Sequence, residues 1–220
     1  MDLLDICPDL DKERIHVTPL GVDLPEPEQI CDARREAVRQ AYGLERPYIF
    51  YPGTLTPRKN MVRGVRAWAA AKRIAHVDLV VTAGKSWRDD DVEQAVDDLG
   101  VRSRFKRLGE VDEADLPALY ACAEALFFPS LYEGFGLPIL EAMACGCPVV
   151  ASKATCLHEV VDTAGLLVDP LDEQAMAAAL ERVLTEKELA ERLRETGQAR
   201  AASLPWEACI RDIYSIVKEL

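Results

Sequence analysis

The stretch SLYEGFGLPILEAMACGCPVV, residues 130–150, places a glycine-bracketed turn and a short helical segment between two apolar runs. Pro138 suits the first position of a helix, and Gly146 suits the residue just past its end. Glu133 is therefore expected in the turn, and Glu141 is expected in the first turn of the helix. A strand, a turn, a helix and a further strand in this order are the parts of a βαβ unit.

The same alternation extends along the chain, because short runs rich in β-branched and aromatic residues are followed by longer amphipathic segments. The sequence predicts an α/β fold: a Rossmann-like, doubly wound parallel sheet with helices on both faces and a helical C-terminal tail. Strands are expected at residues 15–18, 48–51, 78–82, 105–108, 125–128, 149–151 and 166–168. Helices are expected at residues 28–42, 60–74, 90–99, 113–122, 138–145 and 156–161, with helical structure throughout from residue 172.

The charge of the chain is unevenly distributed. A formal net charge of −12 argues against a nucleic-acid partner, whose backbone needs a basic surface. Two segments, residues 51–77 and 99–109, nevertheless carry six and four basic side chains and no acid. Such clusters can concentrate an anionic small molecule. For Arg63, Arg66, Lys72 and Arg73 the simpler interpretation is one solvated face of a helix.

Several sequence features bear on compartment and metals. No charge-free apolar run approaches the ~20 residues that span a bilayer, and the acidic N-terminus does not resemble a secretory signal. We therefore expect a cytoplasmic protein without a transmembrane segment. Cys145 and Cys147 do not have the spacing of a zinc knuckle and are expected in the core. The acidic run RDDD at 88–91 suggests a metal site less readily than a helix cap, so no metal is predicted.

Function is expected where the strands end. In doubly wound sheets, ligands bind beyond the carboxyl ends of the strands, and here the turns contain Gly, Pro or Ser. The glycines of the 130–150 stretch let backbone amides approach a ligand, and a helix N-terminus favours a phosphate. Glu141 can accept hydrogen bonds from a vicinal diol such as a ribose, and Glu133 can reach hydroxyls beyond the phosphates. Alternatively, Glu141 only complements the helix dipole and Glu133 is solvated.

The stretch resembles the signature of the GT-B glycosyltransferases of family 4, the group 1 type. Their two glutamates form an EX7E motif, and Glu133 and Glu141 are likewise separated by seven residues. The resemblance continues through VTPLGVD (17–23), YPGTLTPRKN (51–60), TAGKSW (82–87), the whole of residues 107–152, HEVVDTAGLLVDPLD (158–172) and WEACIRDIY (206–214). It covers the C-terminal, nucleotide-sugar-binding half of that two-domain fold.

This resemblance implies a reaction and a division of the chain. The reaction is retaining, metal-independent transfer of a hexose from a nucleoside-diphosphate sugar to an unknown acceptor, as in polysaccharide biosynthesis, with no cofactor. GDP-mannose is the first guess for the donor and a UDP-sugar the next. Residues 1–25 would be a residual interdomain segment with the first strand, 26–203 the nucleotide-sugar-binding domain and 204–220 a C-terminal crossing helix.

The resemblance also assigns roles to single residues. Glu133 would contact the donor sugar, Glu141 the ribose and Lys59 the diphosphate, with Leu108 in the loop that recognises the base. The backbone amides that face the diphosphate and sugar would belong to Gly134, Phe135, Gly136 and Leu137. Many members have Gly-Arg where this chain has Gly53-Thr54, so Arg58 would supply the missing cation, unless it is solvated. His158, where a proline is frequent, is expected at the surface or in packing.

In that family the acceptor site lies in an N-terminal domain, which this chain does not include. We therefore expect an N-terminal acceptor-binding domain or subunit as partner, without which the chain would be inactive; that half would also provide any peripheral contact with a membrane. A non-catalytic nucleotide-sugar binding or regulatory module is the alternative, and a structural remnant is a third. A glycosidase is disfavoured, since hydrolysis explains neither the cations nor the phosphate site.

The last helix predicts an interaction surface. A stripe at helical spacing consists of Trp206, Ile210, Ile213, Tyr214, Val217 and Leu220. In full-length members the terminal helix crosses to the other domain, so part of the stripe is expected to be exposed, or buried against a second copy in a homodimer. The alternative is that the whole stripe packs on its own domain.

Overall fold

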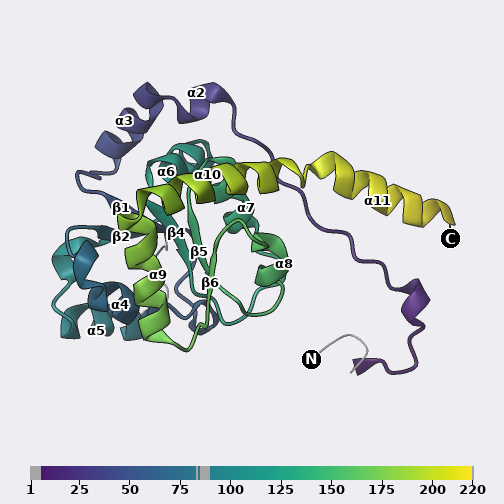
Figure 1. Ribbon diagram of the computed structural model, residues 1–220, viewed down its shortest axis with the longest axis horizontal. Coiled ribbons are helices and arrows are strands. Elements are labelled where there is room, and N and C mark those ends of the chain that lie inside the picture. The colour runs from purple at the N-terminus through teal and green to yellow at the C-terminus, as the bar shows by residue number, and fades with distance from the viewer. Residues whose placement is uncertain (1–5, 83, 85–89, 220) are drawn as a thin grey trace.

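The computed structural model describes residues 6–82, 84 and 90–219. This part of the chain forms a six-stranded parallel sheet in the order β3-β2-β1-β4-β5-β6 (Figure 1). The strands are β1 (Tyr48–Tyr51), β2 (Asp78–Val81), β3 (Phe105–Arg107), β4 (Ala125–Phe128), β5 (Val149–Ser152) and β6 (Leu166–Val168). The predicted doubly wound sheet is confirmed, and its order reverses between β1 and β4.

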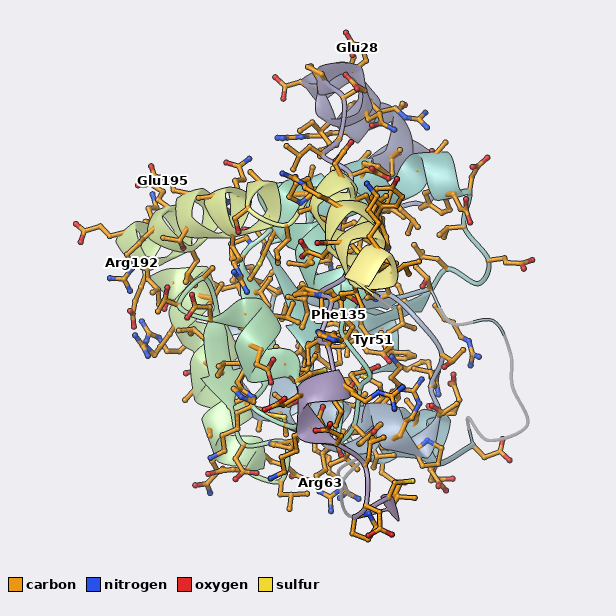
Figure 2. All side chains as sticks on the ribbon, turned by 90° about the vertical axis from the view of Figure 1, so that its right-hand side faces the viewer. Glu28, Tyr51, Arg63, Phe135, Arg192 and Glu195 are labelled. Atoms are coloured by element: carbon orange, nitrogen blue, oxygen red, sulfur yellow. The ribbon has the colours of Figure 1, made fainter. Side chains whose placement is uncertain are left out.

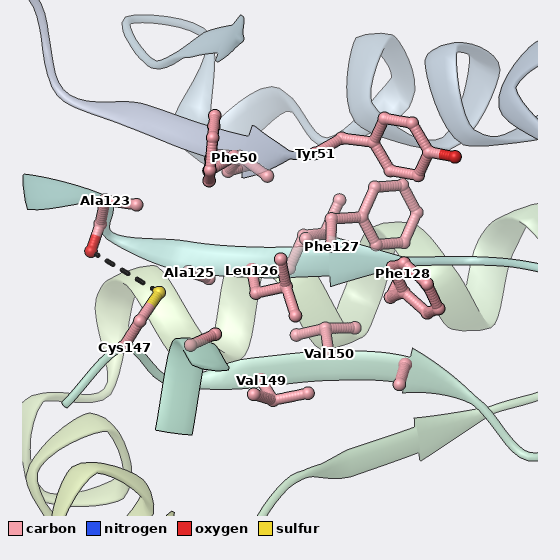
Figure 3. Packing of buried hydrophobic residues seen from close by; sticks show 14 of the residues in the cluster. Phe50, Tyr51, Ala123, Ala125, Leu126, Phe127, Phe128, Cys147, Val149 and Val150 are labelled. Atoms are coloured by element: carbon pink, nitrogen blue, oxygen red, sulfur yellow. Dashed lines mark hydrogen bonds between the residues drawn. The ribbon is translucent and has the colours of Figure 1, made fainter. Parts of the chain in front are cut away.

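The central strands are apolar along their whole length because the sheet is covered on both faces. All four residues of β1, β2, β4 and β5 are buried. Figure 3 shows side chains of β1, β4 and β5 in this core, with the ring of Tyr51 stacked on Phe128 at a centroid distance of 6.1 Å. Cys145 and Cys147 are buried as expected, and the Cys147 Sγ lies 3.9 Å from the Ala123 carbonyl oxygen.

The helices pack against one another around the sheet. The α-helices are α2 (Pro27–Ile30), α3 (Asp32–Ala41), α4 (Met61–Ala70), α5 (Asp90–Asp98), α6 (Leu116–Cys122), α7 (Leu137–Ala144), α8 (Leu157–Val161), α9 (Glu173–Thr185), α10 (Lys187–Ala202) and α11 (Trp206–Glu219). Short 3-10 turns occur at η1 (Lys12–Arg14), η2 (Pro57–Lys59), η3 (Lys72–Ile74), η4 (Arg102–Arg104) and η5 (Glu113–Asp115). Helix α4 packs against α5 and α9, and α9 packs against α10, whereas α6 packs against α3 and α7, and α7 against α10.

The strand expected at residues 15–18 does not form. Both sides of β1 are occupied, by β2 and β4, and residues 15–18 do not pair with the edge strands β3 and β6 either. It is extended chain on the same side of the molecule as α11 (Figure 1). The predicted helix at 28–42 is also divided, since Cys31 has an extended backbone between α2 and α3.

A second correction concerns the helix of the opening stretch. Helix α7 begins at Leu137, with Gly136 as its N-terminal cap and Pro138 within its first two residues. No acidic residue lies in its first turn. Glu141 is therefore the fifth residue of the helix rather than the fourth, just past its first turn, because the left-handed cap at Gly136 lets the helix start one residue before the proline. Gly146 has a left-handed backbone just past the end of α7, as predicted.

Helix α11 presents an apolar face that the described part of the chain leaves uncovered. Ile210, Ile213, Tyr214 and Val217 are 63, 46, 60 and 61% exposed. The prediction that part of the stripe is exposed is confirmed, and the alternative that all of it packs on this domain is wrong. None of the described helices is both long and apolar enough to cross a membrane.

Candidate functional site

The turn after β1 brings Arg58 and Lys59 to the switch point of the sheet. It is the 3-10 turn η2, ended by Asn60 with a left-handed backbone, a conformation that asparagine tolerates better than most residues. The buried Asn60 amide donates to the carbonyls of Pro129 at 3.0 Å and Pro170 at 2.7 Å. The Leu131 N–H donates to the Arg58 carbonyl at 2.8 Å. The turn after β1 is therefore fastened to the loop after β4.

Glu133 lies between these two cations. The Lys59 Nζ donates to its Oε1 at 2.6 Å, and the Arg58 guanidinium donates to its Oε2 at 3.0 Å and to the Tyr132 carbonyl at 3.1 Å. Lys59 is only 8% exposed, and its Nζ also lies 4.8 Å from the centre of the Phe128 ring. Burial by itself raises the pKa of Glu133, but the hydrogen bond and charge of Lys59, the nearby Ser130 and the hydrogen bond of Arg58 together outweigh it and lower that pKa.

The loop that carries Glu133 is also tied to the loop after β5. Thr155, which has a left-handed backbone, places its Oγ1 3.2 Å from both the N–H and the carbonyl of Glu133. The Cys156 thiol donates to the carbonyls of Glu133 and Phe135 at 3.4 Å, and the Ser152 hydroxyl donates to the Ser130 carbonyl at 2.5 Å. These contacts were not predicted from the sequence. The one feature that could have indicated them is that ASKATCLHE, residues 151–159, follows a predicted strand.

The glycine turn offers backbone donors next to this cluster. Gly136 has a φ of 110°, and a Cβ there would lie 2.7 Å from the Leu157 Cδ2, so only glycine fits. Gly134 faces open space instead, with nothing within 4 Å of a Cβ. Among the described residues, no backbone hydrogen bond uses the N–H groups of Gly134, Phe135 or Gly136. Figure 2 views the molecule from the side toward which α11 projects, and it labels Phe135 and the buried Tyr51 near the middle of that view.

Glu141 lines a pocket that does not include Arg58, Lys59 or Glu133. Leu137, Glu141 and Cys145 form one face of α7 and line this pocket of about 450 Å³. The other lining residues come from α6 and the turn before it, from the segment before α3 and from α11: Glu113, Leu116, Pro117, Tyr120, Gly21, Val22, Asp23, Leu24, Pro25, Gln29 and Trp206. The Glu141 Oε2 accepts a hydrogen bond from the hydroxyl of Tyr120 on α6 at 2.7 Å. The pocket extends along α7 from its first residue, Leu137, to its C-terminal cap, Cys145.

The remaining predicted residues lie around the strand ends. The Gly53 N–H donates to the Thr82 Oγ1 at 3.0 Å, and the Thr54 carbonyl accepts from the Tyr51 hydroxyl at 3.0 Å. The Leu108 N–H is taken up by the Val81 carbonyl at 2.9 Å, and Leu108 does not line the pocket of Glu141.

His158 is exposed, and its Nδ1 lies 2.6 Å from the Thr155 carbonyl oxygen, so it is a surface residue as expected. In the second cationic segment, residues 99–109, Arg102 and Arg107 pair with acids of α5 rather than with Glu133. Arg102 pairs with Glu93 and Asp97 of α5, and Arg107 also pairs with Glu93. Arg58 and Lys59 are thus the members of the two segments found at Glu133.

The candidate metal ligands are only partly described. Residues 83 and 85–87 of the predicted TAGKSW loop, and residues 88 and 89 of RDDD, lie outside the described residues. Asp90 and Asp91 lie in the first turn of α5. Within residues 6–82, 84 and 90–219, no group of three or more His, Cys, Asp or Glu side chains could hold a metal ion.

Comparisons with known proteins extend over most of the chain. Residues 34–200 match the family model described as glycosyl transferases group 1. O-antigen chain mannosyltransferase B of Escherichia coli is 40% identical over 176 residues, which cover 79% of this chain and 46% of that protein. Sucrose-phosphate synthase from Thermosynechococcus elongatus is similar in structure, with a TM-score of 0.79 and 29% identity, over 93% of this chain and 52% of that one.

A second similar structure is HepE of Anabaena, solved in complex with UDP and glucose. It has a TM-score of 0.76 over 91% of this chain and 56% of its own, and at 24% identity this likeness concerns the fold alone. The chain spans about half the length of the curated relatives that it matches.

Proposed function

Since this chain belongs to the glycosyl transferases of group 1, we propose that it binds a nucleoside-diphosphate sugar at the carboxyl ends of β1 and β4. It would form the donor half of a retaining, metal-independent transfer of a hexose. The observation that carries the proposal is the contact of Glu133 with Lys59 and Arg58, beside the free N–H groups of the glycine turn.

Each part of such a donor has a matching part of the site. The diphosphate is anionic, and Lys59, Arg58 and the N-terminus of α7 are the nearby positive groups. The ribose diol would lie against Glu141, which lines the pocket of about 450 Å³, and the base would lie at the loop of Leu108. Glu133 would then contact hydroxyls of the sugar. The roles proposed for Gly134, Phe135, Gly136 and Leu137 require only their backbone.

The chemistry follows from the charge that develops in the reaction. When the bond from the anomeric carbon to the diphosphate breaks, negative charge grows on the leaving phosphate, and fixed positive groups aimed at it lower the barrier. Lys59 and Arg58 are both paired with Glu133. We propose that a diphosphate draws both cations toward itself and thereby frees the Glu133 carboxylate for the sugar.

The donor's identity is the finer part of the proposal. The similarity to a protein named a mannosyltransferase supports GDP-mannose as the first candidate, and a UDP-sugar is the second. Recognition of the base would involve the loop at Leu108, through its carbonyl rather than its paired N–H.

The acceptor would be held by an N-terminal domain or separate subunit. The extended N-terminal segment and α11 project on one side of the molecule (Figure 1), and residues 17–20 of that segment line a pocket together with Gly134 and Phe135. A second body between them would cover both the site and the exposed apolar face of α11. A second copy of the chain on that face is the alternative, which the mass in solution distinguishes.

A thermal-shift screen of UDP-, GDP- and ADP-sugars tests donor binding, because a ligand that binds the folded state raises its apparent stability. We expect one nucleotide class to raise the melting temperature, and Glu141→Ala to reduce that rise. Turnover with a supplied N-terminal half then tests catalysis. Binding without turnover in any pairing would favour a non-catalytic nucleotide-sugar module, and no binding at all would refute the proposal.

A further inference from the structure

Tyr120 contacts the carboxylate of Glu141 but was not singled out by its place in the sequence. It lies on α6, is 2% exposed, and donates from its hydroxyl to the Glu141 Oε2 at 2.7 Å. Its ring packs edge-on against Phe50, with centroids 5.3 Å apart and planes at 81°. The position of the hydroxyl is therefore fixed by the core, while Glu141 is only partly buried.

The hydrogen bond restricts a side chain that would otherwise be mobile. Glutamate has several rotatable bonds and loses conformational entropy when it is fixed. Burial raises the pKa of the Tyr120 phenol well above its ordinary value, so the hydroxyl remains a donor. It occupies one acceptor position of the Glu141 carboxylate, and the other positions remain available on the side of the pocket that both residues line.

We propose that Tyr120 is a positioning residue, which holds the Glu141 carboxylate in the orientation that accepts both hydroxyls of a ribose. This inference rests on the proposed donor site. It assigns the preference for a ribonucleotide over a 2′-deoxynucleotide to a pair of side chains on two different helices. Tyr120 itself need not touch the ligand.

The test compares Tyr120→Phe with the wild type by isothermal titration of GDP, UDP and their 2′-deoxy forms. We expect the variant to bind the ribonucleotide about three- to tenfold more weakly, as for a lost hydrogen bond, and to lose less affinity for the 2′-deoxy form, which keeps only the 3′-hydroxyl. Tyr48→Phe is the matched control. It removes another buried phenol, whose hydroxyl donates to the Leu119 carbonyl at 2.6 Å, and should alter neither affinity.

A double-mutant cycle separates positioning from a general structural effect. In a Glu141→Ala background, Tyr120→Phe should have no further effect on affinity. Equal loss for ribo- and deoxynucleotides, a further loss in the Glu141→Ala background, or no loss at all would overturn the role of Tyr120. If the wild type bound none of these nucleotides, the proposed function itself would fail, and the role of Tyr120 with it.

Discussion

The Lys59 Nζ lies 2.6 Å from the Glu133 Oε1, although the two residues are 74 positions apart. They meet because β1 and β4 are neighbours in the sheet, so the turns that follow these strands lie side by side. Both side chains are about 10% exposed. Lys59 and Arg58 are therefore paired with the Glu133 carboxylate at the place where we propose that a diphosphate binds.

Glu133→Gln should strengthen the binding of a free nucleoside diphosphate. The substitution removes a negative charge that competes with the diphosphate for Lys59 and Arg58. We expect affinity to rise about tenfold, since removal of a nearby like charge is worth about 1 to 2 kcal/mol. Isothermal titration measures it, with Glu159→Gln, at an exposed acid, as control. Weaker binding by Glu133→Gln would contradict competition for the cations.

Lys59→Met should weaken nucleoside-diphosphate binding and destabilise the fold together. We expect about tenfold or more loss of affinity and about 1 to 3 kcal/mol loss of unfolding free energy, because Glu133 keeps only Arg58 as a charged partner. Titration and urea denaturation give the two values. Lys72→Met, at an exposed lysine of the same cationic segment, should change neither; an equal effect there would argue against a specific role for Lys59.

The contribution of Glu133 to stability should depend on pH. Its pKa in the folded protein is below the ordinary value of 4.5. A lowered carboxylate pKa contributes stability that is fully present above that ordinary value and is lost as pH falls through the folded pKa. The difference in unfolding free energy between wild type and Glu133→Gln should therefore shrink from pH 7 to pH 3. A difference independent of pH would show that the ion pair is not its source.

The contribution of Asp78 to stability should depend on pH in the opposite direction. Its carboxylate is 2% exposed, its Oδ1 has no hydrogen-bond partner among the described residues, and burial raises its pKa above 3.8 despite Lys106 and Arg46. A raised carboxylate pKa contributes stability below the unfolded pKa and loses it as pH rises through the folded pKa. Asp78→Asn should therefore stabilise the protein by about 1 kcal/mol at pH 8 and less at pH 4. Urea denaturation at both pH values measures this, and destabilisation at pH 8 would contradict it.

The two glycines of the turn should respond differently to alanine. Gly136→Ala should cost about 1 to 3 kcal/mol of unfolding free energy, because its backbone is left-handed and the new Cβ would meet Leu157. Gly134→Ala should stay within about 0.5 kcal/mol of the wild type, because that side of Gly134 is open. Thermal denaturation of the pair tests this, and equal losses would show that the turn is adaptable.

Much of the fold could be predicted from local pattern. Strands that are covered on both faces need continuous apolar runs, so β1 and β4 could be located from YIFY and ALFF. The run at residues 15–18 has a similar local pattern but pairs with no strand. Strand pairing depends on contacts between distant segments, which the local sequence does not specify. The predicted start of α7 at Pro138 is one residue late, because the cap at Gly136 determines where the helix begins.

The sequence by itself determined which chemical groups are available: the spacing of Glu133 and Glu141, the glycines of the turn and the cations of PRKN. Only the tertiary structure decided how they combine. It joined Glu133 to Lys59 and Arg58, and it placed the Tyr120 hydroxyl on Glu141. The physical reason is that spacing along the chain fixes neighbours within one helix or turn. Contacts between different strands and helices depend on the order of the sheet and on the packing of the core.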